Sequence, residues 1–116
     1  MKFQTIELFN YGSRKLNVIH SQMRMLCSKL NAHLFSLHVI DSPQCPCGFN
    51  EEDNNHFLLE CPLYNNPREK MLRGISNVTR NITSDLLLFG DNSFSLEENK
   101  SIFAAVHDYI EATSRC

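Results

Sequence analysis

Apolar side chains recur along most of this chain at the three- and four-residue steps of an α-helix, and no stretch alternates as a half-buried strand does. The first stripe predicts a basic helix over residues 14–37, with a break near Asn31 left open. Its apolar members are Leu16, Ile19, Met23, Leu26, Leu30 and Leu34. This spacing indicates an N-terminal helix that packs one face on a core.

A second stripe predicts a helix that begins near Pro67, because a proline suits the first helical turn, where its missing N–H would find no partner. The apolar members of this stripe are Met71, Leu72, Ile75, Val78 and Ile82. A short apolar run over residues 86–89 ends at Gly90. This pattern predicts one or two further helical turns with a glycine stop.

The last helix has a distinct start, since Ser95 and Glu98 form the Ser-x-x-Glu pattern of a capping box. Its apolar face consists of Ile102, Phe103, Val106, Tyr109 and Ile110. Together the patterns predict a mostly α fold, with a single small helical domain over residues 1–116. In it, the basic helix over 14–37 and C-terminal helices over 67–116 flank an irregular segment over 41–62.

Composition narrows the class of protein. The chain has 116 residues, a hydrophobic fraction of 42% and a formal net charge of −2, which suits one compact domain rather than a disordered tail. The charge is unevenly spread, because residues 1–40 and 67–83 are net positive whereas 41–66 and 84–116 are net negative. No apolar run reaches the length of a membrane span, so no membrane association is expected.

Several catalytic signatures are absent from the sequence: a glycine-rich phosphate loop, an Asp-Asp pair, a Gly-x-Ser-x-Gly elbow and a His-Glu-x-x-His helix. The five cysteines, an odd number, fit a secreted disulfide framework poorly and favour a reducing compartment. Residues 1–10 contain one lysine and no apolar run, so no signal peptide is expected there. We therefore expect an intracellular protein, nuclear or cytoplasmic.

The irregular segment contains the ligand types of a metal site. Its skeleton is C-x-C-x8-H-x4-C, and three thiols with one imidazole make a complete tetrahedral set for Zn²⁺. These four residues are Cys45, Cys47, His56 and Cys61. Thiolate and imidazole donors favour Zn²⁺ over hard cations. Since four protein ligands close the coordination sphere, the expected zinc is structural rather than catalytic.

The residues between these ligands suit such a site. Pro46 keeps the first two cysteines in an extended stretch that points both thiols to one side, and Gly48 can take the positive φ of a tight turn. In a regular helix, His56 and Cys61 would point about 140° apart. A helix that carries His56 is therefore expected to end near Glu60.

Two neighbours are expected to complete that short helix. Asp53 or Asn54 can cap its N-terminus, and Pro62 supplies a bend that brings the last cysteine toward the other ligands.

Other interpretations of these residues stay open. A cysteine is often a small buried hydrophobe, and His33 or His38 could replace a ligand. Cys27 and Cys116 have no partners at metal-ligand spacing; Cys27 lies beside the first apolar stripe, so we expect it in the core.

Basic residues flank the cysteine-rich segment and form a second candidate site. If the segment packs the neighbouring helix ends together, seven cations could contact phosphates. They are Arg14, Lys15, Arg24, Lys29, Arg68, Lys70 and Arg73. Phe49, Phe57 and Tyr64 could stack on bases. The alternative is that the cations are solvated helix faces and that Phe57 belongs to the core.

Three stretches of the sequence together resemble a known family. They are RKLNVIHSQMRMLCSKLNAHL over residues 14–34, DSPQCPCG over 41–48 and NHFLLECPLY over 55–64. They resemble the C-terminal region of non-LTR (LINE-type) retrotransposon reverse transcriptase polyproteins, where a helix leads into a CCHC segment. The tail, with LLLFG over 86–90 and IFAAVHDYIEATSR over 102–115, is similar to the end of such a reading frame.

The resemblance implies zinc ligation by the four residues of the CCHC skeleton and a role in holding RNA template or target DNA. The polymerase, endonuclease and RNase H parts of such polyproteins are absent, so no catalysis is expected. The sequence therefore predicts a non-catalytic, zinc-stabilised nucleic-acid-binding domain. Two alternatives are an inert transposon relic and a protein–protein adaptor whose acidic, apolar C-terminal helix, with Phe94, Phe103 and Tyr109, docks on a partner.

Overall fold

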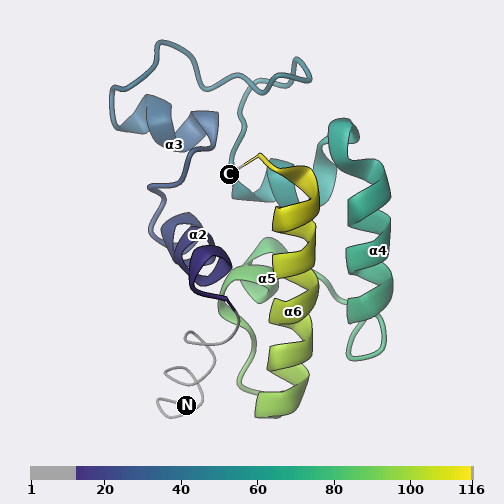
Figure 1. Cartoon of the computed structure of the whole chain (residues 1–116). Helices are drawn as coiled ribbons and strands as arrows, with labels where there is room; N and C mark the ends of the chain where they lie inside the picture. Colours follow the sequence, from purple (N-terminus) through teal and green to yellow (C-terminus); the bar gives the residue numbers. More distant parts are fainter. Residues whose placement is uncertain (1–12, 116) are drawn as a thin grey trace.

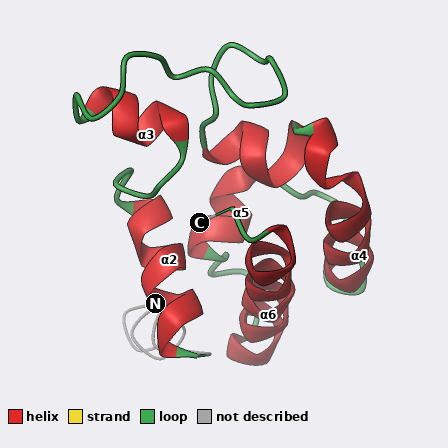
Figure 2. Cartoon of the chain, turned by 45° about the horizontal axis from the view of Figure 1, so that its top comes forward, coloured by secondary structure: helices red, strands yellow, loops and turns green. Residues whose placement is uncertain are grey.

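The computed structural model describes residues 13–115, and it contains helices and loops without a strand over that range (Figures 1 and 2). Residues 1–10, where no signal peptide is expected, and Cys116 lie outside the described residues. The mostly α fold class is confirmed. The elements are α2 (Arg14–Arg24), α3 (Asn31–Ser36), a π-helical turn (His56–Glu60), a 3₁₀ turn (Pro62–Tyr64), α4 (Asn65–Ile75), α5 (Ser84–Phe89) and α6 (Leu96–Thr113).

Helix α6 is the centre of the molecule. Helices α2, α4 and α5 all pack against it, and Figures 1 and 2 show α6 between α2 and α4. All five residues of its predicted apolar face are buried. The rest of the core comes from the helices around it and from the π-helical turn, chiefly Met23, Phe57, Leu58, Met71, Ile75, Leu86, Leu87 and Leu88.

The predicted ends of α5 and α6 are confirmed. Ser95 Oγ accepts a hydrogen bond from Glu98 N at 3.1 Å, and Glu98 Oε1 accepts one from Ser95 N at 2.8 Å, so both halves of the capping box form. Gly90 ends α5 with a φ of +71°, a value that glycine reaches without steric strain. Thr83 caps the other end of α5, where its Oγ1 accepts from Leu86 N.

The basic helix expected over residues 14–37 is two helices; the break covers residues 25–30 and ends directly before Asn31, near which the sequence leaves a break open. Helix α2 ends at Arg24, and Leu26 has a φ of +57°, a conformation that a leucine adopts only when its surroundings impose it. Ser28 Oγ accepts from Leu30 N and bonds His33 Nδ1 at 2.6 Å. Such local side-chain bonds compete with the helical ladder.

The helix predicted from the second stripe is also shorter than the stripe. Helix α4 ends at Ile75, and Val78 and Ile82 pack partly buried against the core from the following loop. Thr79 N and Val78 N both donate to the Ile75 carbonyl, which closes a tight turn. β-Branched residues and asparagine, which fill this stretch, have low helix propensity.

None of the helices in the described part of the chain combines the length and the apolarity needed to cross a bilayer.

Candidate metal centre

The structure brings together the four side chains of the CCHC skeleton. One ligand atom from each of Cys45, Cys47, His56 and Cys61 lies within 4.8 Å of the other three. Two sulfur atoms bound at 2.3 Å to one tetrahedral ion would lie roughly 3.8 Å apart, and a sulfur and an imidazole nitrogen roughly 3.5 Å. The Sγ atoms of Cys45 and Cys61 are 3.7 Å apart, and Cys47 Sγ is 3.3 Å from His56 Nε2. These residues could therefore hold a metal ion.

A tight turn positions the first two thiols. Gly48 N donates to the Cys45 carbonyl, and Cys45 N donates to the Phe49 carbonyl, each at 2.9 Å. Gly48 has a φ of +100°, so the positive φ expected at this glycine is confirmed. Since the chain reverses within five residues, both thiols face the side on which His56 lies.

The second pair of ligands is placed by a π-helical turn. Cys61 N donates to the His56 carbonyl at 2.7 Å, which is an i→i+5 bond. A π-turn sets residue i+5 roughly above residue i, so His56 and Cys61 face the same way without the divergence of an α-helix. The helix ends at Glu60, as expected, and Asp53 is the cap, because its Oδ1 accepts from His56 N at 2.8 Å.

His56 is oriented by its surroundings. Its Nε2 faces Cys47, whereas its Nδ1 is buried, has no hydrogen bond, and lies 3.8 Å from Glu60 Oε1. The ring of Phe49 stacks on the imidazole with centroids 4.4 Å apart and planes 5° from parallel. A carboxylate near the nitrogen that does not face the ion is a common outer partner of a histidine ligand.

Burial and backbone hydrogen bonds set the protonation of the three thiols in opposite directions. Burial raises the pKa of Cys45 to about 12, and burial also raises the pKa of Cys61. The pKa of Cys47 is lowered, chiefly by a hydrogen bond from the Phe49 backbone. Two buried thiols would therefore keep their protons by themselves, and a bound cation would supply the charge that stabilises the thiolates.

An ion pair between the buried Glu52 and the partly exposed Arg115, which no sequence pattern predicts, holds the loop before His56 in place. Glu52 is fully buried and pairs with Arg115, whose Nε donates to Oε2 at 2.7 Å. Glu52 Oε1 also accepts from Asn31 N at 2.8 Å at the start of α3. No local pattern signals the pair, because its members are 63 residues apart.

The other candidate ligands lie elsewhere. His33 is buried, but its Nδ1 bonds Ser28 and its Nε2 has no hydrogen bond. His38 is exposed. Neither belongs to the metal-ligand group that the described residues form. The expectation that Cys27 is in the core is wrong, since it is exposed in the break after α2.

A second buried polar cluster joins α2, α5 and α6. His20 Nε2 donates to the Leu87 carbonyl at 2.8 Å, so its Nδ1 is the acceptor of the neutral ring. Arg24 Nη2 and His107 Nε2 both lie 3.1 Å from this Nδ1. Burial, the Arg24 charge and His107 lower the pKa of His20 well below its ordinary value, despite the opposing bond to Leu87. The cluster fixes α2 to the bundle.

The predicted basic residues do not form one surface. Arg68 must be removed from the set, because it is buried and its guanidinium bonds the Leu58 and Phe57 carbonyls. Arg24 is partly buried, bonds the Leu88 carbonyl and lies over the ring of Phe103. The exposed members fall on both flanks of α6, on α2 and its following loop and on α4 (Figures 1 and 2); they are Arg14, Lys15, Lys29, Lys70 and Arg73.

Only one of the three candidate stacking aromatics presents a large exposed area. Phe57 is fully buried and Tyr64 partly buried, and the two rings meet edge to face. Phe49 is 48% exposed. Of the aromatics named for the adaptor alternative, Phe103 and Tyr109 are buried, so they offer no ring to a partner.

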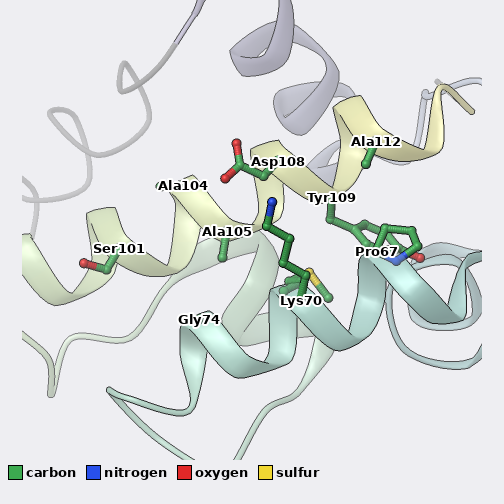
Figure 3. Close-up of a pocket in the computed structure, with 10 residues that line it drawn as sticks. Pro67, Lys70, Gly74, Ser101, Ala104, Ala105, Asp108, Tyr109 and Ala112 are labelled. Carbon is green, nitrogen blue, oxygen red and sulfur yellow. The ribbon is translucent and has the colours of Figure 1, made fainter.

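A shallow groove of about 460 Å³ runs between α4 and α6, away from the cysteines. Small side chains line most of it, and Figure 3 shows Lys70 of α4 extending toward Asp108 of α6 across it. The positive charge of Lys70 is therefore partly offset by a facing carboxylate.

No protein-family model, no curated protein and no solved structure matches this chain.

Proposed function

We propose that the four clustered side chains bind Zn²⁺ and that this zinc is structural. The observation that carries the proposal is the convergence of three Sγ atoms and one Nε2 within 4.8 Å. Soft thiolate donors with one imidazole favour Zn²⁺ among the common cations. Because all four positions are taken by protein atoms, no open position remains for water or substrate.

The metal content of the purified protein tests this proposal. Native mass spectrometry is expected to find one Zn²⁺ per chain in the wild type and in Cys27→Ser, which removes an exposed thiol outside the cluster. Cys45→Ser is expected to lose the metal. Equal metal content in Cys45→Ser and the wild type would refute the assignment.

We further propose that the zinc-stabilised domain binds RNA or DNA without catalysis, as the resemblance to the C-terminal region of LINE-type reverse transcriptases implies. Five exposed cations, Arg14, Lys15, Lys29, Lys70 and Arg73, support this role, and of these Arg73 also pairs with Glu69 at 3.4 Å. The need for reduced thiolates fits an intracellular compartment.

The test is retention of single-stranded RNA and DNA at increasing salt. Affinity that comes from phosphate contacts falls steeply with salt, because each contact releases counterions. Lys15→Gln and Lys29→Gln are expected to reduce that slope. A flat salt response of the wild type would contradict phosphate binding, and an inert relic would retain neither polymer.

One observation favours the adaptor as a second candidate function. Five of the large exposed apolar side chains lie within one stretch of the chain: Met25, Leu26, Phe35, Leu37 and Val39. Exposed apolar side chains that gather on a surface often mark a protein interface, and this stretch of the chain is a candidate for one. A second copy of the chain is the occupant to test, since one patch can pair with itself across a two-fold axis. Sedimentation that depends on concentration in the wild type and not in Leu37→Ser with Val39→Ser would support it.

A further inference from the structure

Phe49 is an exposed aromatic ring that stacks on one ligand residue of the candidate metal centre. One face of the ring lies parallel to the imidazole of His56, with centroids 4.4 Å apart. The side chain is nevertheless 48% exposed. Since the inner face is covered by His56, the exposed area belongs to the outer face and the edge.

The backbone around this ring is constrained. The Phe49 carbonyl accepts from Cys45 N at 2.9 Å, and the neighbouring Gly48 carbonyl accepts from Gln44 Nε2 at 3.1 Å. With Cys45 held by an ion, the ring is preorganised. A ligand that covers it would therefore pay little conformational entropy.

The charge around Phe49 limits what it can bind. Residues 41–66 contain five acidic side chains and no lysine or arginine; the buried Glu52 is neutralised by Arg115, which leaves four, and three thiolates with Zn²⁺ leave a formal charge of about −1. A phosphate is not attracted to such a loop. A neutral, flat π-system is a suitable ligand, because stacking on an aromatic ring needs no positive charge.

We infer that the outer face of Phe49 stacks an unpaired nucleobase, so the ligand class is single-stranded nucleic acid rather than duplex. This inference rests on the proposed nucleic-acid function. The cations on α2 and on its following loop, which lie on one flank of α6 (Figures 1 and 2), then contact the phosphates, and Phe49 contacts a base. A base inside a duplex offers no free face to the ring, which is why an unpaired strand is required.

The salt dependence of binding distinguishes the phosphate contacts from the base contact at Phe49. Phe49→Ala is expected to weaken binding of a 12-nucleotide uridine oligomer about tenfold at every salt concentration, because one stacked base is lost. The salt slope should stay unchanged, since no phosphate contact is removed. Lys15→Gln should lower the slope instead. Phe49→Leu keeps an apolar cover over His56 and should show the same loss while retaining its metal.

A fluorescent version of the ring gives a direct reading. The chain contains no tryptophan, so Phe49→Trp introduces a single one. Its emission is expected to be quenched by the uridine oligomer and not by an abasic strand of equal length and charge. Phe89→Trp is the matched control, because Phe89 is 44% exposed on α5, away from the loop.

The outcomes separate the two proposals. Equal quenching by the abasic strand, equal quenching of Phe89→Trp, or unchanged affinity of Phe49→Leu overturns the stacking role while nucleic-acid binding stands. Failure of the wild type to bind either single-stranded RNA or single-stranded DNA overturns both.

Discussion

The helical bundle and the metal loop bury different kinds of side chain. In the bundle, formed by α2, α4, α5 and α6, the buried side chains are mainly apolar and surround Phe103, Val106 and Ile110. The metal loop, residues 27–55, buries mostly polar groups. Its buried polar residues are Ser28, His33, Glu52 and Asn54, against the apolar Leu30 and Cys45.

The contrast shows that one short chain uses two sources of stability. Burial of apolar surface drives the bundle together. The metal loop has too little apolar surface for that, so directional contacts hold it: the ion pair of Glu52, the bond from Asn54 Nδ2 to the Met23 carbonyl at 2.9 Å, and the cysteine cluster. The two regions should therefore respond to different perturbations.

Removal of the metal should give the largest difference between the regions. Zinc binding supplies on the order of 10 kcal/mol in finger peptides, so a chelator or Cys45→Ser should unfold the metal loop, including α3, and the π-helical turn that follows it. Amide hydrogen exchange should show lost protection over residues 27–61, with α4 and α6 still protected. The Cys27→Ser protein should exchange like the wild type. Uniform loss over the whole chain would show that the two regions are one cooperative unit.

A core truncation should act on the bundle. Phe103 is fully buried and its ring meets His20 with centroids 4.5 Å apart. Phe103→Ala is expected to lower the free energy of unfolding by about 3–5 kcal/mol through lost burial and a cavity. Urea unfolding followed by circular dichroism measures it. Phe89→Ala, at an exposed position, should change the midpoint little; comparable losses in both variants would contradict the assigned core.

Loss of the ion pair should loosen the metal loop alone. Glu52→Gln leaves Arg115 without its carboxylate, and removal of one partner of a largely buried pair is expected to cost about 2–3 kcal/mol, moderated by the partial exposure of Arg115. A double-mutant cycle with Arg115→Gln, read by urea unfolding at saturating zinc, isolates the coupling. Glu51→Gln is the neighbouring exposed control. Zero coupling would mean that the pair contributes nothing to the loop.

Acid should weaken the bundle by the smallest step. The pKa of His20 is lowered in the folded state, so the unfolded chain takes up a proton first as the pH falls below about 6.5. Stability is full above that pH and falls by about 1.4 kcal/mol per pH unit until the lowered folded value is reached. His20→Gln should flatten the slope between pH 7 and pH 5.5, with metal content checked at each pH. An unchanged slope would show that other groups cause the loss of stability in acid.

What the sequence predicted well was local. The capping box of α6, its apolar face and the glycine stop of α5 depend on residues within one or two turns, and all three form. The four clustered ligand residues were also found from spacing, because their donor types and the turn residues between them lie within one segment.

The end of α2 and the burial of Arg68 depend on contacts that residue spacing does not encode. The end of α2 is set by the positive φ of Leu26 and by bonds from Ser28, neither of which has a periodic signal. Arg68 has the same one-dimensional signature as an exposed arginine, yet a bond to the hydroxyl of Tyr109, 41 residues away, helps to bury it. A hydrophobic pattern predicts which face of a helix is buried, but it does not predict which charged side chain is buried with it.

The π-turn at His56 lets the chain hold one residue more between its last two ligands than a regular helix would accept. An α-helix sets residues i and i+4 on one face and turns residue i+5 about 100° further round, so the i→i+5 bond absorbs the extra residue. Deleting one of the four intervening residues would leave an ordinary helical turn that still presents the imidazole and the thiol on one side. An insertion would instead swing the thiol away from the other donors, so this interval should tolerate the loss of one residue better than a gain.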